Sequence, residues 1–308
     1  MGRYSLRRLL QLIPVVFGTT FLIYVLTWAL PGDPFAGKCG QRPCPEPYIA
    51  AQTERLNLDD PLLVQYFKYL QDLFTLNLGE TFNGESIQSL VAAAFPVTLR
   101  LTALAIIIQL VIGVALGVLS ALRRGGIIDN LVLVFTMLIV SIPIFVVGYL
   151  TQYVFGVELG WFPVTASPEV PTGDLILPAI VLASVSLAFV ARLTRTSLIE
   201  SMRADYVRTA VAKGLPRRRV VIRHALRNSM IPVITFVGAD FGALLGGAIV
   251  TEGIFNIPGV GGLTYDAISS GEAAMVVTIV TMIVIIFLIA NLLVDLLYAV
   301  LDPRIRYE

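Results

Sequence analysis

Few side chains in this sequence could do chemistry, and those few are widely separated along the chain. The single histidine is His224, and the only cysteines are Cys39 and Cys44. A structural zinc site needs about four converging ligands, so these residues predict no metal centre. Cys39 and Cys44 could be two metal ligands or a disulfide, and in an oxidising loop outside the cell a disulfide is the better interpretation. His224 stands among arginines, where we interpret it as a surface residue that contacts a partner.

The sequence also lacks the residue patterns expected of an enzyme. It has no His-Glu-x-x-His pair and no paired aspartates in an apolar segment, which an intramembrane hydrolase would need. It has no Gly-x-x-x-x-Gly-Lys-Ser/Thr loop, the backbone cradle that binds nucleotide phosphates. We therefore predict that the chain is not an enzyme and has no catalytic residue, metal or cofactor of its own.

One carboxylate, Asp240, falls in the middle of a long apolar segment. An ionisable group inside a membrane is by default a functional hypothesis, such as a residue of a transport pathway. The alternative is a buried, hydrogen-bonded group that packs against a neighbouring helix. A proton relay would need more than one such group, and both interpretations of Asp240 stay open.

The elements that position these residues are predicted to be membrane helices. Hydrophobic residues make up 56% of the 308 residues and charged residues 14%, whereas about a quarter of the residues in soluble domains are charged. Six apolar segments are long enough to cross about 30 Å of hydrocarbon, namely residues 9–30, 101–122, 130–157, 175–191, 229–251 and 273–294. The first is too long for a signal peptide and lacks a cleavage pattern, so we expect a retained helix. The predicted fold is an all-α, polytopic, six-helix transmembrane bundle.

Basic residues are distributed unevenly between the predicted loops. The N-terminus, the loop at Arg123 and Arg124, residues 192–227 and the C-terminal tail together hold 17 of the 22 lysines and arginines. The positive-inside rule places that side, including both termini, in the cytoplasm. The opposite loops hold 14 of the 21 acidic residues, so we expect an acidic outer face.

Residues 32–96 form the largest predicted external loop. Asp60 and Pro61 resemble a helix start, with an acidic N-cap and proline at the first helical position. Apolar residues then recur at helical spacing, namely Leu62, Leu63, Tyr66, Phe67, Leu70, Leu73 and Phe74. This stripe predicts a helix that lies on the membrane surface or against the bundle, as part of a small external helical insertion.

The cytoplasmic stretch 194–232 shows more order than a simple loop. Mostly apolar residues recur there every three or four positions, namely Leu198 or Ile199, Met202, Tyr206, Ala210 and Lys213. Gly214 is a helix stop, and Pro216 begins a basic run that extends to Arg227. The pattern predicts a short amphipathic helix, a sharp turn and a basic helix. Positive-inside topology alone would explain the arginines but not the amphipathic helix, and nucleic-acid binding fits poorly because the segment is short and held against a membrane.

Several short motifs follow one another along the whole chain. They are Leu30-Pro31-Gly32-Asp33-Pro34, Leu159-Gly160-Trp161-Phe162-Pro163, Asp205-Tyr206-Val207-Arg208-Thr209-Ala210, Lys213-Gly214-Leu215, Arg223-His224-Ala225-Leu226-Arg227-Asn228, Ile231-Pro232, Phe255-Asn256-Ile257-Pro258-Gly259-Val260-Gly261 and Asp302-Pro303-Arg304. This order resembles the B-type permease of dipeptide or oligopeptide importers, a branch of the binding-protein-dependent ABC permeases. Arg208 and Thr209 stand where the general family pattern has Glu and the first Ala, a departure typical of the peptide and nickel branch.

The resemblance implies a single ABC-importer transmembrane domain over residues 1–308, with an external insertion at 32–96 and a cytoplasmic coupling segment at 195–228. The residues expected to couple the chain to an ATPase are Met202, Asp205, Tyr206, Arg208, Thr209, Ala210, Gly214 and Leu215. The implied partners are a second permease subunit, two ATP-binding subunits that carry ATP and Mg²⁺, an external substrate-binding protein and membrane lipid, without nucleic acid. The implied location is the bacterial inner membrane.

The substrate that the resemblance implies is a peptide, most simply a dipeptide. Nickel chelates and glutathione are carried by similar permeases and stay open. A gradient-driven secondary transporter is the alternative class, but inverted repeats and paired buried carboxylates would then be expected. The sequence shows one such carboxylate and no clear repeat.

The loop around the two cysteines has a possible role of its own. Prolines and the ring between Cys39 and Cys44 would make residues 38–45 stiff. Preorganisation lowers the cost of binding a partner. We therefore expect this loop either to contact the external binding protein and help to release cargo, or to be a surface feature without function.

Overall fold

The computed structural model describes the backbone of residues 2–28, 44–81 and 84–301, and the side chains within 9–28, 44–81 and 84–292. The described chain is almost entirely helical, with one isolated β-bridge between Glu80 and Ser86. The helices are α1 (Gly2–Trp28), α2 (Glu46–Arg55), α3 (Leu62–Phe74), α4 (Ile87–Leu122), α5 (Ile127–Ser141), α6 (Ile144–Thr151), η1 (Gln152–Glu158), η2 (Thr172–Leu175), α7 (Ile176–Arg203), α8 (Asp205–Ala212), α9 (Arg217–Arg219), η3 (Val220–Leu226), α10 (Arg227–Phe255), α11 (Val260–Ser269) and α12 (Ala273–Leu301).

The predicted all-α bundle is confirmed, with one correction to its spans. Within the described residues, five helices are long and apolar enough to cross a membrane. A pair of helices bent by 104°, α5 with α6–η1, makes a sixth span if the two halves are counted together. The sequence predicted one unbroken helix over 130–157, which is wrong. Ile142 is extended (φ −99°, ψ 128°), because the ring of Pro143 disfavours a helical conformation at the residue before it. Pro14, by contrast, lies inside α1.

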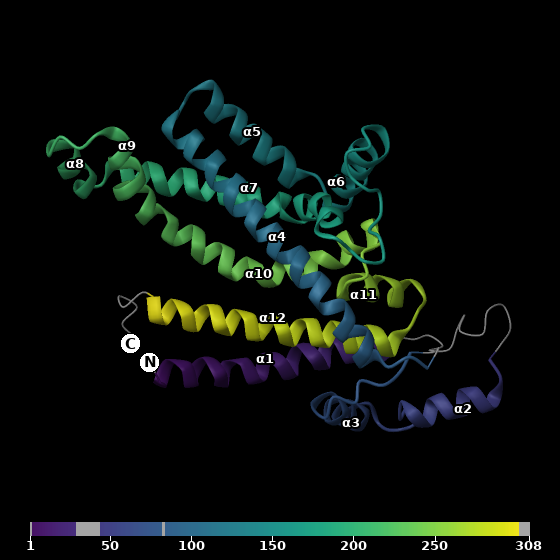
Figure 1. Ribbon diagram of the computed structural model, residues 1–308. Helices are drawn as coiled ribbons and strands as arrows, with labels where there is room; N and C mark the ends of the chain where they lie inside the picture. Colours follow the sequence, from purple (N-terminus) through teal and green to yellow (C-terminus); the bar gives the residue numbers. More distant parts are fainter. Residues whose placement is uncertain (1, 29–43, 82–83, 302–308) are drawn as a thin grey trace.

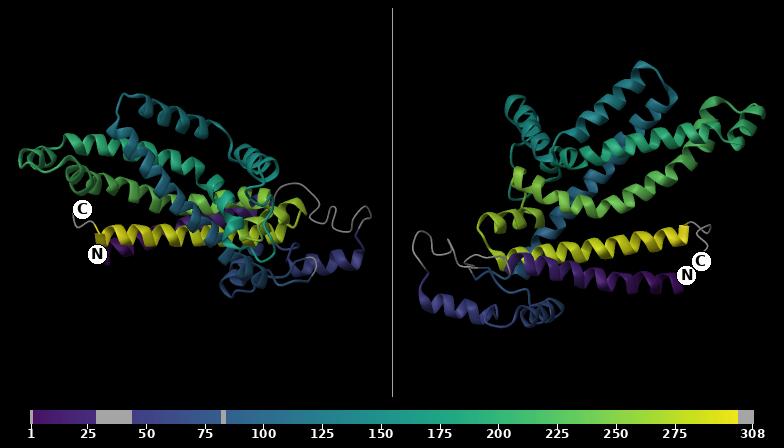
Figure 2. Two further views of the ribbon diagram at one scale, coloured as in Figure 1. Left: turned by 45° about the horizontal axis from the view of Figure 1, so that its top comes forward. Right: turned by 180° about the vertical axis from the view of Figure 1, so that it is seen from behind.

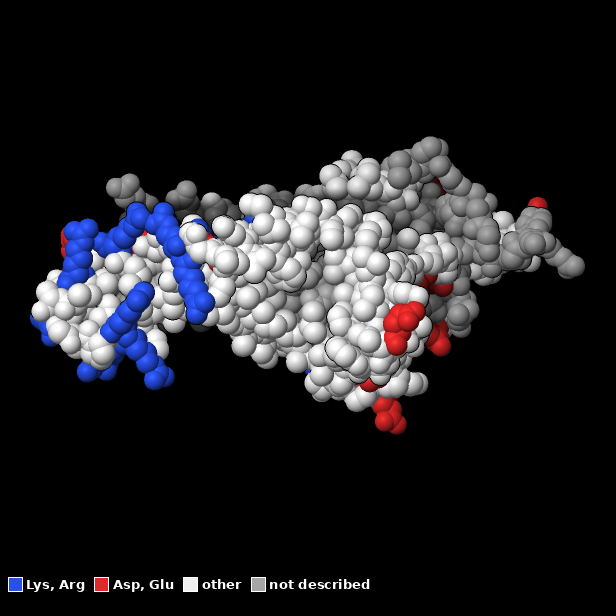
Figure 3. All heavy atoms as spheres, turned by 90° about the horizontal axis from the view of Figure 1, so that it is seen from above, with Lys and Arg blue, Asp and Glu red and all other residues white. Residues whose placement is uncertain are grey.

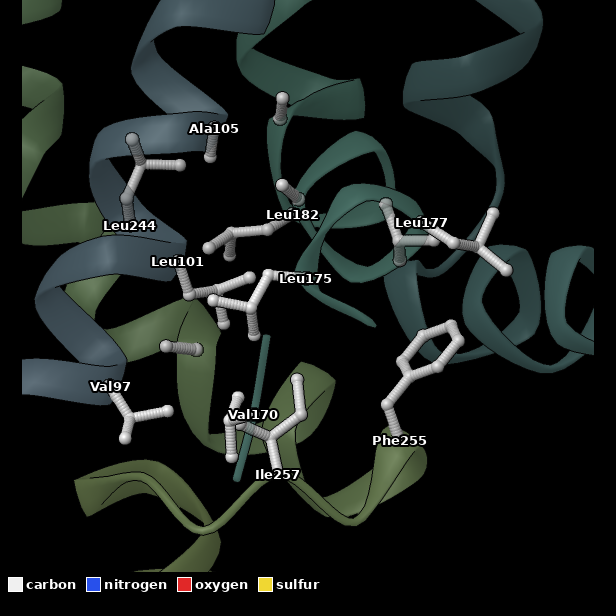
Figure 4. Packing of buried hydrophobic residues seen from close by; sticks show 14 residues of the cluster. Val97, Leu101, Ala105, Val170, Leu175, Leu177, Leu182, Leu244, Phe255 and Ile257 are labelled. Atoms are coloured by element: carbon white, nitrogen blue, oxygen red, sulfur yellow. The ribbon is translucent and has the colours of Figure 1, made fainter. Parts of the chain in front are cut away.

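Four of the membrane helices pack into one group, and two others form a pair beside it. Figures 1 and 2 show α4, α5, α7 and α10 close together, while α1 and α12 run alongside one another below α10. A cluster of buried residues from α4, α7 and α10 forms the centre of the first group, closed by Val170 and Ile257 from two loops (Figure 4). A second cluster joins α1, α3 and α12.

Close approach of α4 to α7 depends on two glycines four residues apart on α4, Gly113 and Gly117. A Cβ atom added to Gly113 would lie 2.8 Å from Val190 Cγ1, and one added to Gly117 would lie 2.5 Å from the Ala191 carbonyl oxygen. Gly242 and Gly246 have the same spacing on α10, but only Gly242 lies at a close contact. A Cβ at Gly242 would overlap the Phe287 ring of α12, whereas Gly246 has open space beside it.

The two ends of the bundle differ in charge. Helices α8 and α9, the start of α1 and the end of α12 lie at one end in Figure 1, and α2, α3 and α11 lie at the other. Lysine and arginine side chains gather over the α8–α9 end, while glutamate and aspartate side chains appear at the opposite end (Figure 3). The charge separation inferred from the loops is therefore present in the folded chain.

Helix α3 lies against the bundle, which is one of the two arrangements expected for this helix of the external insertion. The Tyr66 hydroxyl donates to the Phe17 carbonyl at 3.0 Å and lies 2.8 Å from the Thr20 hydroxyl of α1. The predicted helix start was wrong by one residue, because Pro61 is the N-cap and no side chain caps the helix. The predicted stripe is divided: Tyr66 is buried, whereas Phe67 is exposed.

Candidate functional site at the basic end

The predicted amphipathic helix is in fact two helices. Helix α7 continues to Arg203, Ala204 is extended (φ −69°, ψ 149°), and α8 begins at Asp205. The single-residue break turns the chain, so α8 is a separate eight-residue helix between the ends of α7 and α10. Asp205 stands in the first turn of α8, where a carboxylate interacts favourably with the free backbone N–H groups.

The inward face of α8 differs from the predicted stripe. Val207 and Ala210 are buried against Leu198 of α7 and against Val220 and Ala225 of η3. Tyr206 and Lys213 were expected on this apolar face, but both side chains are exposed. The stripe was placed wrongly because the extended Ala204 changes the rotation of α8 relative to α7.

The outward face of α8 is available for a partner. It presents a mixture of aromatic, charged, hydroxyl and aliphatic side chains, namely Asp205, Tyr206, Arg208, Thr209 and Val211. The Arg208 guanidinium lies 3.4 Å from the Asp205 carboxylate, three residues before it on the same helix. Both side chains are largely solvated, so this pair contributes little to stability. Met202 and Leu215 pack at the margin of the buried cluster beneath α8.

Gly214 follows α8 and ends it in a left-handed backbone conformation. Its φ is +76°, a left-handed value that glycine adopts without a steric penalty. The Leu215 N–H donates to the Ala210 carbonyl at 3.3 Å and the Gly214 N–H to the Val211 carbonyl at 2.9 Å, as in helix ends closed by glycine. The chain then enters α9 and η3, which run without interruption into α10. The expected basic helix is therefore the first part of the fifth span.

A buried ion pair that sequence reasoning missed lies beside this segment. Asp129, in the first turn of α5, is 1% exposed. Arg195 of α7 donates from Nε to Asp129 Oδ1 at 2.6 Å and from Nη2 to Oδ2 at 2.8 Å. The Gly125 N–H donates to Oδ2 at 2.8 Å, and the Ser120 hydroxyl of α4 also contacts the carboxylate. Asp129 is an acidic residue next to an otherwise basic loop, and this sequence feature could have revealed the ion pair.

Comparison with known proteins identifies the family. Residues 113–307 match the binding-protein-dependent transport system inner membrane component, and residues 1–102 match the N-terminal region of such components. The chain belongs to this family. It is an ABC transporter permease and a multi-pass membrane protein.

Relatives resemble this permease over their whole length. It is 37% identical to a probable peptide ABC transporter permease of Sinorhizobium fredii and 38% identical to the dipeptide permease DppB of Alkalihalophilus pseudofirmus, with 100% of each chain covered. It is 36% identical to the oligopeptide permease OppB of Salmonella typhimurium, again over 100% of both chains. Among solved structures, the inward-facing methionine transporter MetNI matches with a TM-score of 0.57 and 19% identity, over 69% of this chain and 96% of that one. This likeness supports the fold.

Asp240 of the permease has polar neighbours, and within the described residues it forms no salt bridge. The hydroxyl of Ser186 on α7 and the amide of Gln109 on α4 lie beside its carboxyl group. Gln109 is fully buried, and neither its amide atoms nor Asp240 Oδ2 has a close hydrogen-bond partner in the described part of the chain. Asp240 itself is half-buried, so the arrangement fits a polar contact between three helices, α4, α7 and α10.

Glu252 is a second buried carboxylate of the permease, which the sequence placed in an external loop. It lies in α10 and is 0% exposed. Its Oε2 accepts the Gly262 N–H at 2.9 Å, and a Cβ at Gly259 would lie 2.3 Å from that oxygen. The Thr98 hydroxyl of α4 accepts the Val260 N–H at 2.8 Å. The end of the motif from Phe255 to Gly261 therefore lies close against one carboxylate. The glycines of this motif were the sequence feature that could have revealed the contact.

The predicted disulfide lies partly outside the described residues. Cys39 and most of the loop 38–45 are not described, so the pairing with Cys44 and the contact with a binding protein stay predictions.

Proposed function

We propose that this permease is the translocation subunit of an ATP-driven importer of peptides, most simply dipeptides. The observation that carries the proposal is α8, a short helix whose apolar side is buried and whose polar side projects from the basic end of the bundle. A helix with this shape can fit a groove on a separate ATPase subunit. Full-length relatives named for peptides and dipeptides support the substrate class.

The docking contacts are proposed to come from the outward face of α8, while its inward face holds the helix in place. Tyr206, Arg208 and Thr209 would touch the ATPase, together with Asp205. Ala210 and Met202 would hold the helix against the bundle, while Gly214 and Leu215 fix where it ends. ATP and Mg²⁺ would bind only to the ATPase, which is why the chain needs no phosphate loop.

The proposed assembly contains a second permease subunit, two ATPase subunits and an external binding protein, in the inner membrane. Both termini of this chain would lie in the cytoplasm, because the arginines gather at that end. Closure of the ATPases on ATP would move the α8 helices and switch the bundle from inward-facing to outward-facing. Nickel chelates and glutathione are the competing substrates of the same class of transporter.

The test substitutes Tyr206, which is 41% exposed on α8, and compares it with Tyr149, which is 54% exposed on α6 at the other end of the bundle. We expect Tyr206→Ala to lower ATP-dependent dipeptide uptake by about tenfold, the effect of losing about 1.4 kcal/mol of binding to the ATPase. Co-purification of the ATPase should fall in parallel. Tyr149→Ala should have less than a twofold effect on both.

Two results would contradict the proposal. One is normal uptake and normal ATPase association in the Tyr206→Ala variant. The other is uptake by the parental protein that persists without ATP but stops when the proton gradient is removed, which would favour a gradient-driven transporter.

A further inference from the structure

The Asp129–Arg195 pair joins three separate elements through one carboxylate. Ser120 belongs to the last turn of α4, Gly125 to the α4–α5 turn, Asp129 to the start of α5 and Arg195 to α7. The guanidinium meets both carboxylate oxygens, at 2.6 and 2.8 Å. A two-point contact of this kind fixes the angle between two side chains as well as their distance, which a lysine ammonium cannot do.

The pair lies about one helical turn along α7 from a residue that packs against α8. Arg195 and Leu198 are on the same helix, three residues apart, and Leu198 is 0% exposed beneath Val207 and Ala210 of α8. Val118 and Ala121 of α4 pack against the same cluster. A displacement of α8 therefore moves the end of α7, and the ion pair is where the start of α5 is attached to that end.

Helix α5 has few other buried attachments. Its buried residues are Asp129, Val132 and Thr136, while Leu131 and Leu138 are more than half exposed. The described contacts therefore hold the cytoplasmic end of α5 mainly through one charged contact. Removing one partner from such a contact leaves an unpaired buried charge, whereas neutralising both partners does not.

The far end of α5 connects to the external side of the bundle. After the bend at Pro143, α6 packs against the end of α10, where a Cβ at Gly148 would lie 2.9 Å from Ile254 Cδ1. The Gln152 amide donates to the Ile254 carbonyl at 3.1 Å and to the Val164 carbonyl at 2.7 Å. A rigid α5 thus connects the α8 end of the molecule to the opposite end.

From these contacts we infer that Asp129 and Arg195 are positioning residues that transmit the displacement of α8 to α5 and α6. This inference rests on the proposed function, since it assumes that an ATPase moves α8. The pair touches neither cargo nor ATPase in this account. Its role is to make the ends of α4 and α7 and the start of α5 move as one body.

The first test measures peptide transported per ATP hydrolysed in the assembled transporter. Arg195→Lys keeps the charge but loses the two-point contact. We expect at least a fivefold fall in this ratio, with ATPase co-purification and membrane level within twofold of the parent. The matched control is Arg192→Lys on the same helix. The Arg192 guanidinium stacks on the Phe189 ring, 4.9 Å from its centre, and does not pair with a carboxylate in the described part of the chain.

A double substitution separates positioning from charge balance. Asp129→Asn alone leaves Arg195 without its charge partner, so we expect a lower membrane level. Asp129→Asn with Arg195→Gln should recover that level, since no unpaired charge is left, while the transport ratio stays low. Parental coupling in either the double variant or Arg195→Lys would overturn the inference.

A distance measurement gives an independent readout. Spin labels at Leu131 of α5 and Ile222 of η3, which are 62% and 53% exposed, would be placed in a background without Cys39 and Cys44. In the parent, we expect the distance between the two labels to be the same with and without nucleotide. In Arg195→Lys, we expect nucleotide binding to produce a second, different distance. Identical distributions in both proteins would contradict the inference. Absence of ATP-dependent uptake by the parent, or normal uptake and normal ATPase association in Tyr206→Ala, would instead contradict the proposed function.

Discussion

Three acidic side chains inside this bundle have three different environments. Asp129 meets an arginine, Glu252 meets a backbone N–H group, and Asp240 lies beside an amide and a hydroxyl. A buried charge is costly unless it is paired or hydrogen-bonded. At the residue scale, the environment of each carboxylate therefore indicates its role better than its presence in an apolar segment does.

The Glu252 environment leads to a prediction about Gly259. A methyl group at this position would lie within 2.3 Å of the carboxylate, so Gly259→Ala must displace Glu252 or the α10–α11 connection. Overpacking of this kind costs about 1–3 kcal/mol. We expect a lower midpoint of thermal unfolding for the detergent-solubilised variant. Gly246→Ala, which meets no atom within 4 Å, is the control and should be neutral or stabilising; equal midpoints for the two variants would contradict the account.

Sequence reasoning found these residues unevenly, for a physical reason. Gly214 and Asp240 were singled out because a helix stop and an intramembrane charge are local signals. The Asp129–Arg195 pair joins positions 66 apart in the sequence, and only the packing of α5 on α7 brings them together. Glu252 looked like a loop residue because the sequence pattern did not show that α10 continues to Phe255.

At the scale of elements, local sequence predicted the existence of helices better than their interruptions. Pro143 ends α5, whereas Pro232 lies inside α10, although both follow an isoleucine in an apolar segment. The difference depends on whether neighbouring helices satisfy the freed backbone groups. The extended Ala204, which separates α7 from α8, is likewise not marked by any glycine or proline.

The end of α8 gives a prediction at this scale. Gly214 has φ +76° and nothing within 4 Å of a Cβ at that position, so the requirement is conformational and not spatial. Valine strongly disfavours this left-handed region, at a cost of about 1–3 kcal/mol, while asparagine tolerates it. We expect Gly214→Val to lower ATPase co-purification much more than Gly214→Asn. Equal losses in both variants would show that the backbone conformation is not what matters.

At the scale of the whole molecule, the bundle has an α8 end and an opposite end that differ in charge and in structure. Basic side chains surround α8 and α9 (Figure 3), while α2, α3 and α11 occupy the acidic end. The contacts through Arg195, Asp129, α5 and α6 run between the two ends. This layout suits a subunit that receives motion on one side of a membrane and uses it on the other.

The central claim is that the outward face of α8 docks on an ATPase. The most direct measurement is cross-linking in native membranes from a cysteine placed at Val211, which is 59% exposed on α8, with Tyr149→Cys at the opposite end as control. Both variants would carry serine at positions 39 and 44. The account predicts a covalent permease–ATPase product from position 211, changed in yield by ATP, and none from position 149. At equal membrane levels, a product from position 149, or none from position 211, would contradict it.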